Sequence, residues 1–344
     1  MKSMELQQII AMTKRLCEAP GTSGREDGAA AVAEELLAPL GTVTRNPLGS
    51  VLCCVNQGEP GAPHLMLEAH LDQIGMVVTR LEKGGFLRVA NVGGLDCRLL
   101  PASPVTVHGQ GGRYPGVIAS TPPHLCDGKE KPLKMEDILV DTGLSQEEAE
   151  AAFAPGDPIT LDGGFTMMAN NMMLSPCQDD RVGCVAVIAA AGMIQEAKPR
   201  CRVTVCLSAQ EETSGFGAGT AAFSLAPDMA ILVDVSFGDG FGVKDHECGK
   251  MNGGTEIDLA PAVSRRMFDR LRKIAKEKEI PWQTHIMGGR TGTDTDIVAS
   301  SGRGVRCGLL SIPLRSMHTA VETVCARDVL STARLMAEFA KEVE

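Results

Sequence analysis

Apolar residues recur in two different patterns along this 344-residue chain. From about residue 182 onward, segments with helical periodicity alternate with short apolar runs that are rich in β-branched residues. Strands that alternate with helices predict an α/β fold, with a mostly parallel sheet and helices on both of its faces. The predicted helices are 182–197, one near Ala218, 264–278, 295–300 and 326–343, and the predicted strands are 203–207, 229–235, 281–286 and 305–312.

The first 72 residues predict two helices followed by two strands. Residues 4–17 have the periodicity of an amphipathic helix, and Ser23 with Glu26 has the spacing of a capping box for a second helix that ends before Gly41. The strand candidates are 43–55, interrupted at Asn46-Pro47, and 64–69. These elements have no core of their own, so we expect them to join the sheet.

Residues 73–166 consist of short alternating runs separated by glycine and proline, for example 76–79, 86–89, 105–108 and 159–162. This pattern predicts a small β-rich domain, a barrel or a sandwich. One helix is expected, where Ser145 and Glu148 form a capping box ahead of 150–153, and residues 127–135 are expected to form a charged loop. We therefore predict one α/β domain, residues 1–72 and 167–344, with 73–166 as an inserted domain.

The composition excludes several classes of function. A formal net charge of −10 argues against nucleic acid and anionic membranes as partners, and an aromatic content of 3% leaves few stacking surfaces for bases or sugars. Twelve cysteines are scattered without a C-x-x-C pair, which predicts reduced thiols. No apolar run is long enough to span a membrane, and the N-terminus lacks the pattern of a signal peptide. We expect a cytoplasmic globular protein.

Two adjacent acids, Glu211 and Glu212, follow the strand at 203–207 and enter a glycine-rich loop. Neighbouring residues on an extended chain point to opposite sides, so one acid could bind a metal ion while the other faces a substrate or a water. An isolated acid pair at a strand end is more often simply solvated. The meaning of this pair therefore depends on the other polar residues near it.

Further histidines and carboxylates follow other predicted strands, at the sheet edge where ligands bind in open α/β folds. Taken singly, each of these residues could have a purely structural role. The acids before residue 182, for example, could cap the predicted helix that follows them. Together, nitrogen and carboxylate groups without thiolate indicate a catalytic site for zinc or another divalent ion. The residues are His70 and Asp72 after 64–69, Asp179 and Asp180 before 182, Asp234 at the end of 229–235, and His318 after 305–312.

The number of candidate ligands predicts two ions rather than one, because a single catalytic zinc usually takes three protein ligands. A carboxylate shared by two ions about 3.5 to 4 Å apart would hold a hydroxide between them. Asp72 lies two residues beyond His70 and is placed to accept the other imidazole N–H of that histidine.

Five ordered segments carry a resemblance to a known family: EAHLDQIGMVVT, QDDRVGC, AQEETSGFGA, ILVDVS and LRSMHTAVE. They resemble the cytosolic aminopeptidases of the tetrahedral (TET) type, glutamyl and leucyl aminopeptidases within the clan of co-catalytic zinc exopeptidases. The resemblance implies that His70, Asp179 and Asp234 hold one ion and that Asp179, Glu212 and His318 hold the other. It also implies Glu211 as the general base, a PDZ-like dimerisation domain at 73–166, and a homo-oligomer, commonly a dodecameric tetrahedral shell.

Related enzymes with carboxypeptidase or deacylase activity share this ligand order, but their second domain interrupts the chain between the fourth and last ligands. Here the long gap lies between His70 and Asp179, which favours the TET type. Two stretches depart from the family pattern, 237–254 and GRTGTDTD around Asp294. We expect both to border the substrate pocket.

The expected reaction is hydrolysis of N-terminal residues from peptides by a water that two divalent ions activate, with Glu211 as general base and Asp72 as a second catalytic residue. Zinc is the expected metal, with cobalt or manganese as alternatives. The alternative functions are a related metal-dependent deacylase or carboxypeptidase, a metal-independent glycosidase and a non-catalytic scaffold. The single tryptophan disfavours the glycosidase, and the complete ligand set disfavours the scaffold.

Overall fold

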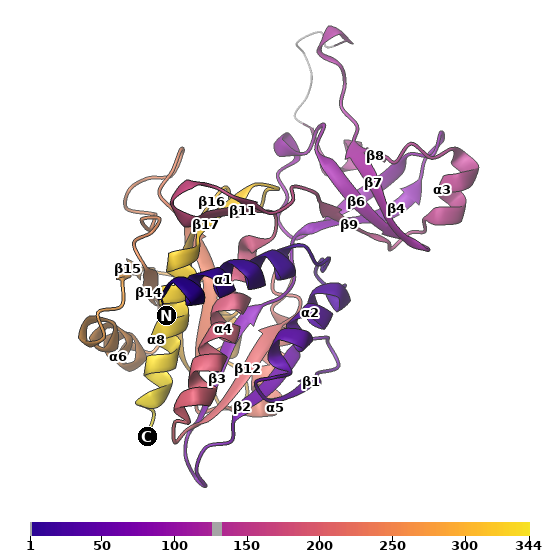
Figure 1. Cartoon of the computed structure of the whole chain (residues 1–344). Coiled ribbons are helices and arrows are strands. Elements are labelled where there is room, and N and C mark those ends of the chain that lie inside the picture. The colour runs from indigo at the N-terminus through magenta and orange to yellow at the C-terminus, as the bar shows by residue number, and fades with distance from the viewer. Residues whose placement is uncertain (1, 126–132) are drawn as a thin grey trace.

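The computed structural model describes residues 2–125 and 133–344, and its larger part is built on an 11-stranded sheet (Figure 1). The expected charged loop at 127–135 lies mostly outside the described residues. The strands of this sheet are β1 Thr42–Arg45, β2 Val51–Asn56, β3 His64–His70, β10 Thr166–Met167, β11 Met172–Ser175, β12 Arg202–Ser208, β13 Met229–Phe237, β14 Thr255–Leu259, β15 Trp282–Ile286, β16 Arg306–Arg315 and β17 Glu322–Cys325.

The sheet is mixed, with its parallel part at the centre. The strand order is β1-β2-β12-β3-β13-β16-β17-β11-β10, and β14 pairs with β16 and β15. β12, β3, β13 and β16 run parallel to one another, as do β14 and β15. The remaining pairings are antiparallel, including β14 with β16. The prediction of a mostly parallel sheet therefore holds for the central strands and not for the whole sheet.

Helices cover both faces of the sheet, as predicted (Figure 1). Alternate residues of β3 show why: Leu65 and Leu67 belong to the core on one face, and Met66 belongs to the core on the other. The first face carries α1 Lys2–Cys17, α2 Asp27–Leu37, α4 Gln178–Ala197, α6 Arg265–Glu277 and α8 Ala326–Lys341, and the second carries α5 Phe216–Leu225 and α7 Thr295–Val298.

Residues 75–161 contain a closed barrel with its own hydrophobic core, and Figure 1 shows it standing out from the larger part. Its strands pair in the order β4-β5-β8-β7-β6-β9. Of the two alternatives for this segment, the barrel is the one observed. The elements are β4 Gly75–Leu81, β5 Leu87–Val92, β6 Pro104–Gly109, β7 Gly112–Ile118, β8 Leu139–Asp141, α3 Gln146–Ala152 and β9 Pro158–Leu161.

One of the two predicted capping boxes is present. The Ser145 hydroxyl accepts the Glu148 N–H, and the Glu148 carboxylate accepts the Ser145 N–H, at the start of α3. The Ser23–Glu26 box is wrong, because α2 begins at Asp27 without a side-chain cap. The Glu26 carboxylate instead accepts the N–H groups of Gly24 and Gln210, which joins this segment to the loop after β12.

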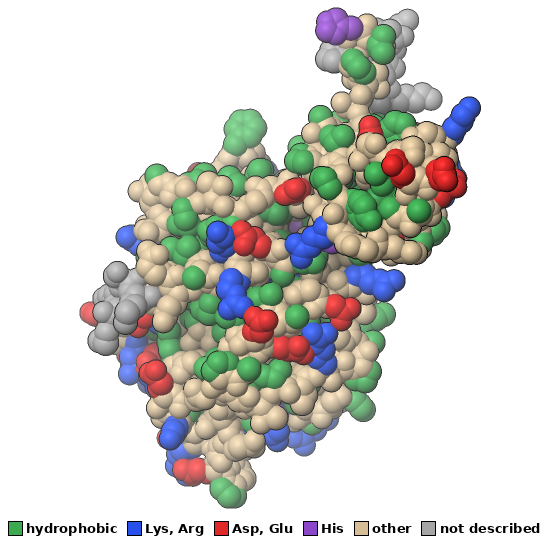
Figure 2. Space-filling model, turned by 45° about the vertical axis from the view of Figure 1, so that its right-hand side comes forward, with side chains coloured by type: hydrophobic (Ala, Val, Ile, Leu, Met, Phe, Trp, Pro, Cys, Tyr) green, Lys and Arg blue, Asp and Glu red, His purple; other side chains and the backbone are tan. Residues whose placement is uncertain are grey.

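The surface shown in Figure 2 carries Lys and Arg side chains interspersed with Asp and Glu. Within the described residues, none of the helices combines the length and the apolar character needed to cross a bilayer. The eleven cysteines in the described ranges are free thiols, most of them buried, in agreement with the prediction of reduced thiols.

Replacing Ser145 by alanine should destabilise α3 by about 1 kcal/mol, because the Glu148 N–H loses its acceptor. Hydrogen exchange of the α3 amides should then be about fivefold faster. Ser264→Ala is the matched control, since Ser264 occupies the N-cap of α6 without a side-chain cap bond. If Ser264→Ala accelerated exchange in α6 as much as Ser145→Ala does in α3, the effect would come from replacing an N-cap serine and not from losing its cap bond.

Candidate metal centre

The carboxyl ends of the central parallel strands bring polar side chains to one edge of the sheet. His70, at the end of β3, is in register with Ser208 at the end of β12, and Asp234 on β13 is in register with Ser311 on β16. This edge opens into a cavity of about 1080 Å³. The five predicted ligands and the predicted base all line that cavity: His70, Asp179, Glu211, Glu212, Asp234 and His318.

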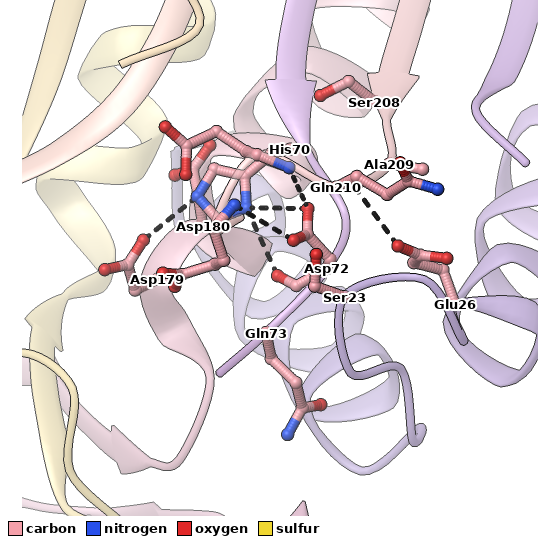
Figure 3. A network of polar contacts seen from close by, with 12 residues as sticks. Ser23, Glu26, His70, Asp72, Gln73, Asp179, Asp180, Ser208, Ala209 and Gln210 are labelled. Atoms are coloured by element: carbon pink, nitrogen blue, oxygen red, sulfur yellow. Dashed lines mark hydrogen bonds and ion pairs between the residues drawn. The ribbon is translucent and has the colours of Figure 1, made fainter. Parts of the chain in front are cut away.

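His70 lies between carboxylates on both sides of its ring (Figure 3). Its Nε2 is 3.1 Å from Asp179 Oδ1 and 3.9 Å from Asp234 Oδ1. Its Nδ1 is 3.5 Å from Asp72 Oδ1 and 3.2 Å from the Asp72 carbonyl oxygen. Burial alone would lower the pKa of His70, but its contacts with Asp179 and Asp72 raise that pKa well above the usual value. His70 Nε2 therefore faces Asp179 and Asp234, while Asp72 holds the ring through Nδ1.

Asp179 presents one oxygen to each of the two histidines. Its Oδ1 faces His70, and its Oδ2 is 3.3 Å from His318 Nε2. The same His318 nitrogen is 3.4 Å from Glu212 Oε1. Asp179 and Glu212 together raise the pKa of His318 to about 11. Although burial opposes it, the contacts with both histidines hold the pKa of Asp179 below its usual range.

The fully buried carboxylate of Asp72 fixes the backbone of the acid pair. Its Oδ1 accepts the Glu211 N–H at 2.9 Å, and its Oδ2 accepts the Glu212 N–H at 3.1 Å. Glu211 and Glu212 lie in a turn, so the expectation that strand alternation separates them is wrong. The two side chains in this turn still have different surroundings. Glu212 contacts His318, whereas the charges of His70 and Asp234 act on Glu211. Burial raises the pKa of Glu211 to about 9.

Two groups of three side chains have ligand atoms within 4.8 Å of one another. One is His70, Asp179 and Glu212, and the other is His70, Asp180 and Asp234. Asp180, a candidate from its position in the sequence, therefore lies with the predicted ligands, although the family resemblance implied a role for Asp179 alone. One oxygen of Asp180, Oδ1, accepts the Gly183 N–H in the first turns of α4.

Two buried oxygens in these groups make no hydrogen bond among the described residues: Asp180 Oδ2, and Glu212 Oε1, whose neighbour His318 Nε2 lies 3.4 Å away. A buried acceptor without a partner is costly, and a bound cation would remove that cost. The donor set of imidazole nitrogens and carboxylate oxygens suits zinc, manganese or cobalt. The residues present therefore fit divalent metal ions.

Glu322, on β17, is a positioning residue that sequence reasoning did not identify. It is 1% exposed, and its two carboxylate oxygens accept the N–H of Asp179 at 3.1 Å and the N–H of His318 at 2.9 Å. Glu322 thereby joins the start of α4 to the loop after β16. Glu322 ends the segment LRSMHTAVE that carries the family resemblance, but its residue type and spacing do not indicate its role, because its partners are backbone groups.

A second group of buried polar side chains surrounds Ser208 at the end of β12. The Ser208 hydroxyl is 2.6 Å from Glu68 Oε1 and 2.9 Å from Asp294 Oδ2, and both carboxyls are buried. Asp294 lines the cavity, as expected for the GRTGTDTD stretch. From the other departing stretch, 237–254, Phe237 lines it.

Comparison with known proteins identifies the family. The sequence pattern of M42 glutamyl aminopeptidases matches residues 49–335. The chain belongs to the M42 glutamyl aminopeptidase family. This M42 chain is 31% identical over 340 residues to the lysyl aminopeptidase of Pyrococcus furiosus, and the match covers 97% of each chain.

Solved structures agree with this membership. The M42 chain is similar to aminopeptidase APDkam598 from the archaeon Desulfurococcus kamchatkensis, with a TM-score of 0.92, 31% identity and coverage of 98% of this chain and 95% of that one. It is also similar to the Pyrococcus horikoshii TET1 peptidase, with a TM-score of 0.86, 28% identity and coverage of 97% and 99%. That peptidase is described as assembling into a tetrahedron or a large octahedral shell.

These matches confirm the predicted resemblance to TET-type aminopeptidases. They also confirm a metal-dependent aminopeptidase, a hydrolase of peptide bonds. The roles of single residues and the number and identity of the ions stay predictions.

Changing Glu322 to glutamine should weaken metal binding. The glutamine amide has only one oxygen, so the backbone N–H of either Asp179 or His318 would lose its acceptor and face the amide NH₂. Loss of such a supporting hydrogen bond typically costs about 10- to 100-fold in metal affinity. Competition with a chelator measures this for Zn²⁺, and Glu338→Gln on α8 is a charge-matched control remote from the cluster. Unchanged affinity in a folded Glu322→Gln variant would contradict the positioning role.

Proposed function

We propose that this M42 peptidase removes N-terminal residues from peptides with two divalent ions held at the cavity floor. The position of Asp179 carries this proposal. Its two oxygens face His70 and His318 separately, which is the arrangement a carboxylate needs to lie between two ions. Glu212 and His318 would complete one site, and Asp234, with Asp180 beside it, the other.

When bound, the two ions would lower the pKa of a water and polarise the scissile carbonyl. Zinc is the proposed metal, with cobalt and manganese as alternatives that the same ligands accept. Asp72 would act by holding the His70 ring and the turn of the acid pair.

Glu211 is proposed as the general base. Its carboxylate lines the cavity beside His70 and Asp234, while Glu212 is directed to His318. Positive charge at the cluster would favour the ionised form of Glu211, which is the form that accepts a proton. Glu211 would take the proton from the attacking water and deliver it to the leaving amine.

We further propose that the chain forms a homo-oligomer in the cytoplasm, with a tetrahedral dodecamer as one such assembly. The similar Pyrococcus horikoshii TET1 peptidase is described as able to assemble into a tetrahedron or a large octahedral shell. In this chain, Leu99, Val117 and Leu125 are exposed apolar side chains of the segment that contains the barrel, and such side chains suit contact between copies. The same proposal includes residues 73–166 as a PDZ-like domain through which two copies dimerise.

The variant Glu211→Gln should lose about 10²- to 10⁴-fold in kcat while its metal content stays that of the wild type, because only the proton acceptor is removed. Hydrolysis of aminoacyl anilides measures turnover, with N-acylated anilides as uncleaved controls, and mass spectrometry counts the ions. Glu212→Gln, the matched neighbour, should instead lose metal. Substantial activity of Glu211→Gln would place the base elsewhere.

A further inference from the structure

A third group of potential ligands lies outside the catalytic cluster. Glu256 and Asp258 on β14 and His285 on β15 have ligand atoms within 4.8 Å of one another. Strand register explains this convergence, because Glu256 and Asp258 are two residues apart and share a face, and Asp258 pairs directly with His285. The three side chains therefore meet on one face of the sheet.

This group is separated from the catalytic cluster by β16. Asp234 pairs with Ser311, and Ser311 pairs with Glu256, so Glu256 lies two strand positions from Asp234. At normal strand spacing that is roughly 10 Å. An ion among Glu256, Asp258 and His285 would therefore occupy a site of its own. His285 and Ser311 line the catalytic cavity, so this site would lie in the cavity wall.

The two carboxylates are buried with little to balance their charge. Asp258 is 0% and Glu256 3% exposed. Within the described part of the chain, His285 is the basic side chain at ion-pair distance from Asp258, with its Nδ1 3.3 Å from Asp258 Oδ1. When both carboxyls are ionised, one imidazole balances only one of the two charges, and a bound cation would neutralise the other.

The remaining contacts leave a ligand position free. The Ser311 hydroxyl donates to Asp258 Oδ2, and the Ser236 hydroxyl donates to Glu256 Oε2. Asp258 Oδ1 is buried and makes no hydrogen bond of acceptable geometry within the described residues. A simple Asp–His ion pair with aligned N–H and oxygen would satisfy this atom. The Asp258–His285 contact is an ion pair at 3.3 Å that leaves Asp258 Oδ1 without a hydrogen bond among the described residues, and this free oxygen and the second carboxylate together fit a metal site.

We propose that Glu256, Asp258 and His285 bind a divalent transition-metal ion in the wall of the substrate cavity, separate from the catalytic cluster. Imidazole nitrogen and carboxylate oxygen are donors that zinc and manganese accept, and a zinc site with three protein ligands keeps a further position open for water. Ser236 and Ser311 line the cavity beside these carboxylates. The site adds to the proposed peptidase function and does not depend on it.

Counting bound Zn²⁺ per chain after dialysis against free metal tests the proposal. Asp258→Asn and His285→Gln should each lower the count by one relative to the wild type. Two variants are needed because Asp258 is fully buried, whereas His285 is only half-buried and lies on a terminal strand. Asp328→Asn is the matched control: Asp328 is a buried carboxylate that accepts the N–H groups of Asn252 and Gly254 and belongs to none of the ligand groups.

The same measurement in an Asp179→Asn background separates this site from the catalytic one. That change should remove zinc from the cluster and leave one ion per chain, which Asp258→Asn should then remove. An unchanged count in folded Asp258→Asn and His285→Gln would overturn the proposal and leave an ion pair without metal. Loss of one ion in Asp258→Asn, whatever Asp179→Asn does, would support the wall site even if the catalytic cluster bound no metal.

Discussion

The register of the central strands is the constraint on which the rest of the structure depends. Ser208, His70, Asp234, Ser311 and Glu256 form one polar row across β12, β3, β13, β16 and β14, with Asp234 level with His70 because Leu232 pairs with Glu68. A shift of one residue in any strand would turn its polar side chain into the opposite, apolar core. The extensive core that α1, α4 and α8 form with the other face of the sheet therefore also fixes the site.

Two buried carboxylates convert this row into a rigid site. Asp72 joins the end of β3 to the turn that carries Glu211 and Glu212, and Glu322 joins the start of α4 to the His318 loop. In both cases the acceptors are satisfied by backbone N–H groups, so the ligands are held before any ion arrives. The remaining unpaired oxygens mark where positive charge is needed.

The sequence placed the six predicted side chains at one cavity because residues of metal-ligand type stand at or near the ends of apolar strands, as His70 and Asp234 do. Their roles stay predictions. The sequence failed where three-dimensional contact decides. The strand β14 was missed because its alternate residues, Glu256 and Asp258, are acidic although they face a buried wall. Glu322 was missed because it binds backbone groups, and the Ser23–Glu26 capping box failed because Glu26 binds the loop after β12 instead.

The central claim is that the side chains gathered at the carboxyl ends of the parallel strands hold two ions with Asp179 between them. Anomalous X-ray diffraction from zinc-loaded crystals, recorded on both sides of the zinc absorption edge, tests it most directly. We predict two peaks in the cavity floor, one beside His70 and Asp234 and one beside Glu212 and His318, with an Asp179 oxygen next to each. A single peak, or peaks that Asp179 does not contact, would contradict the account.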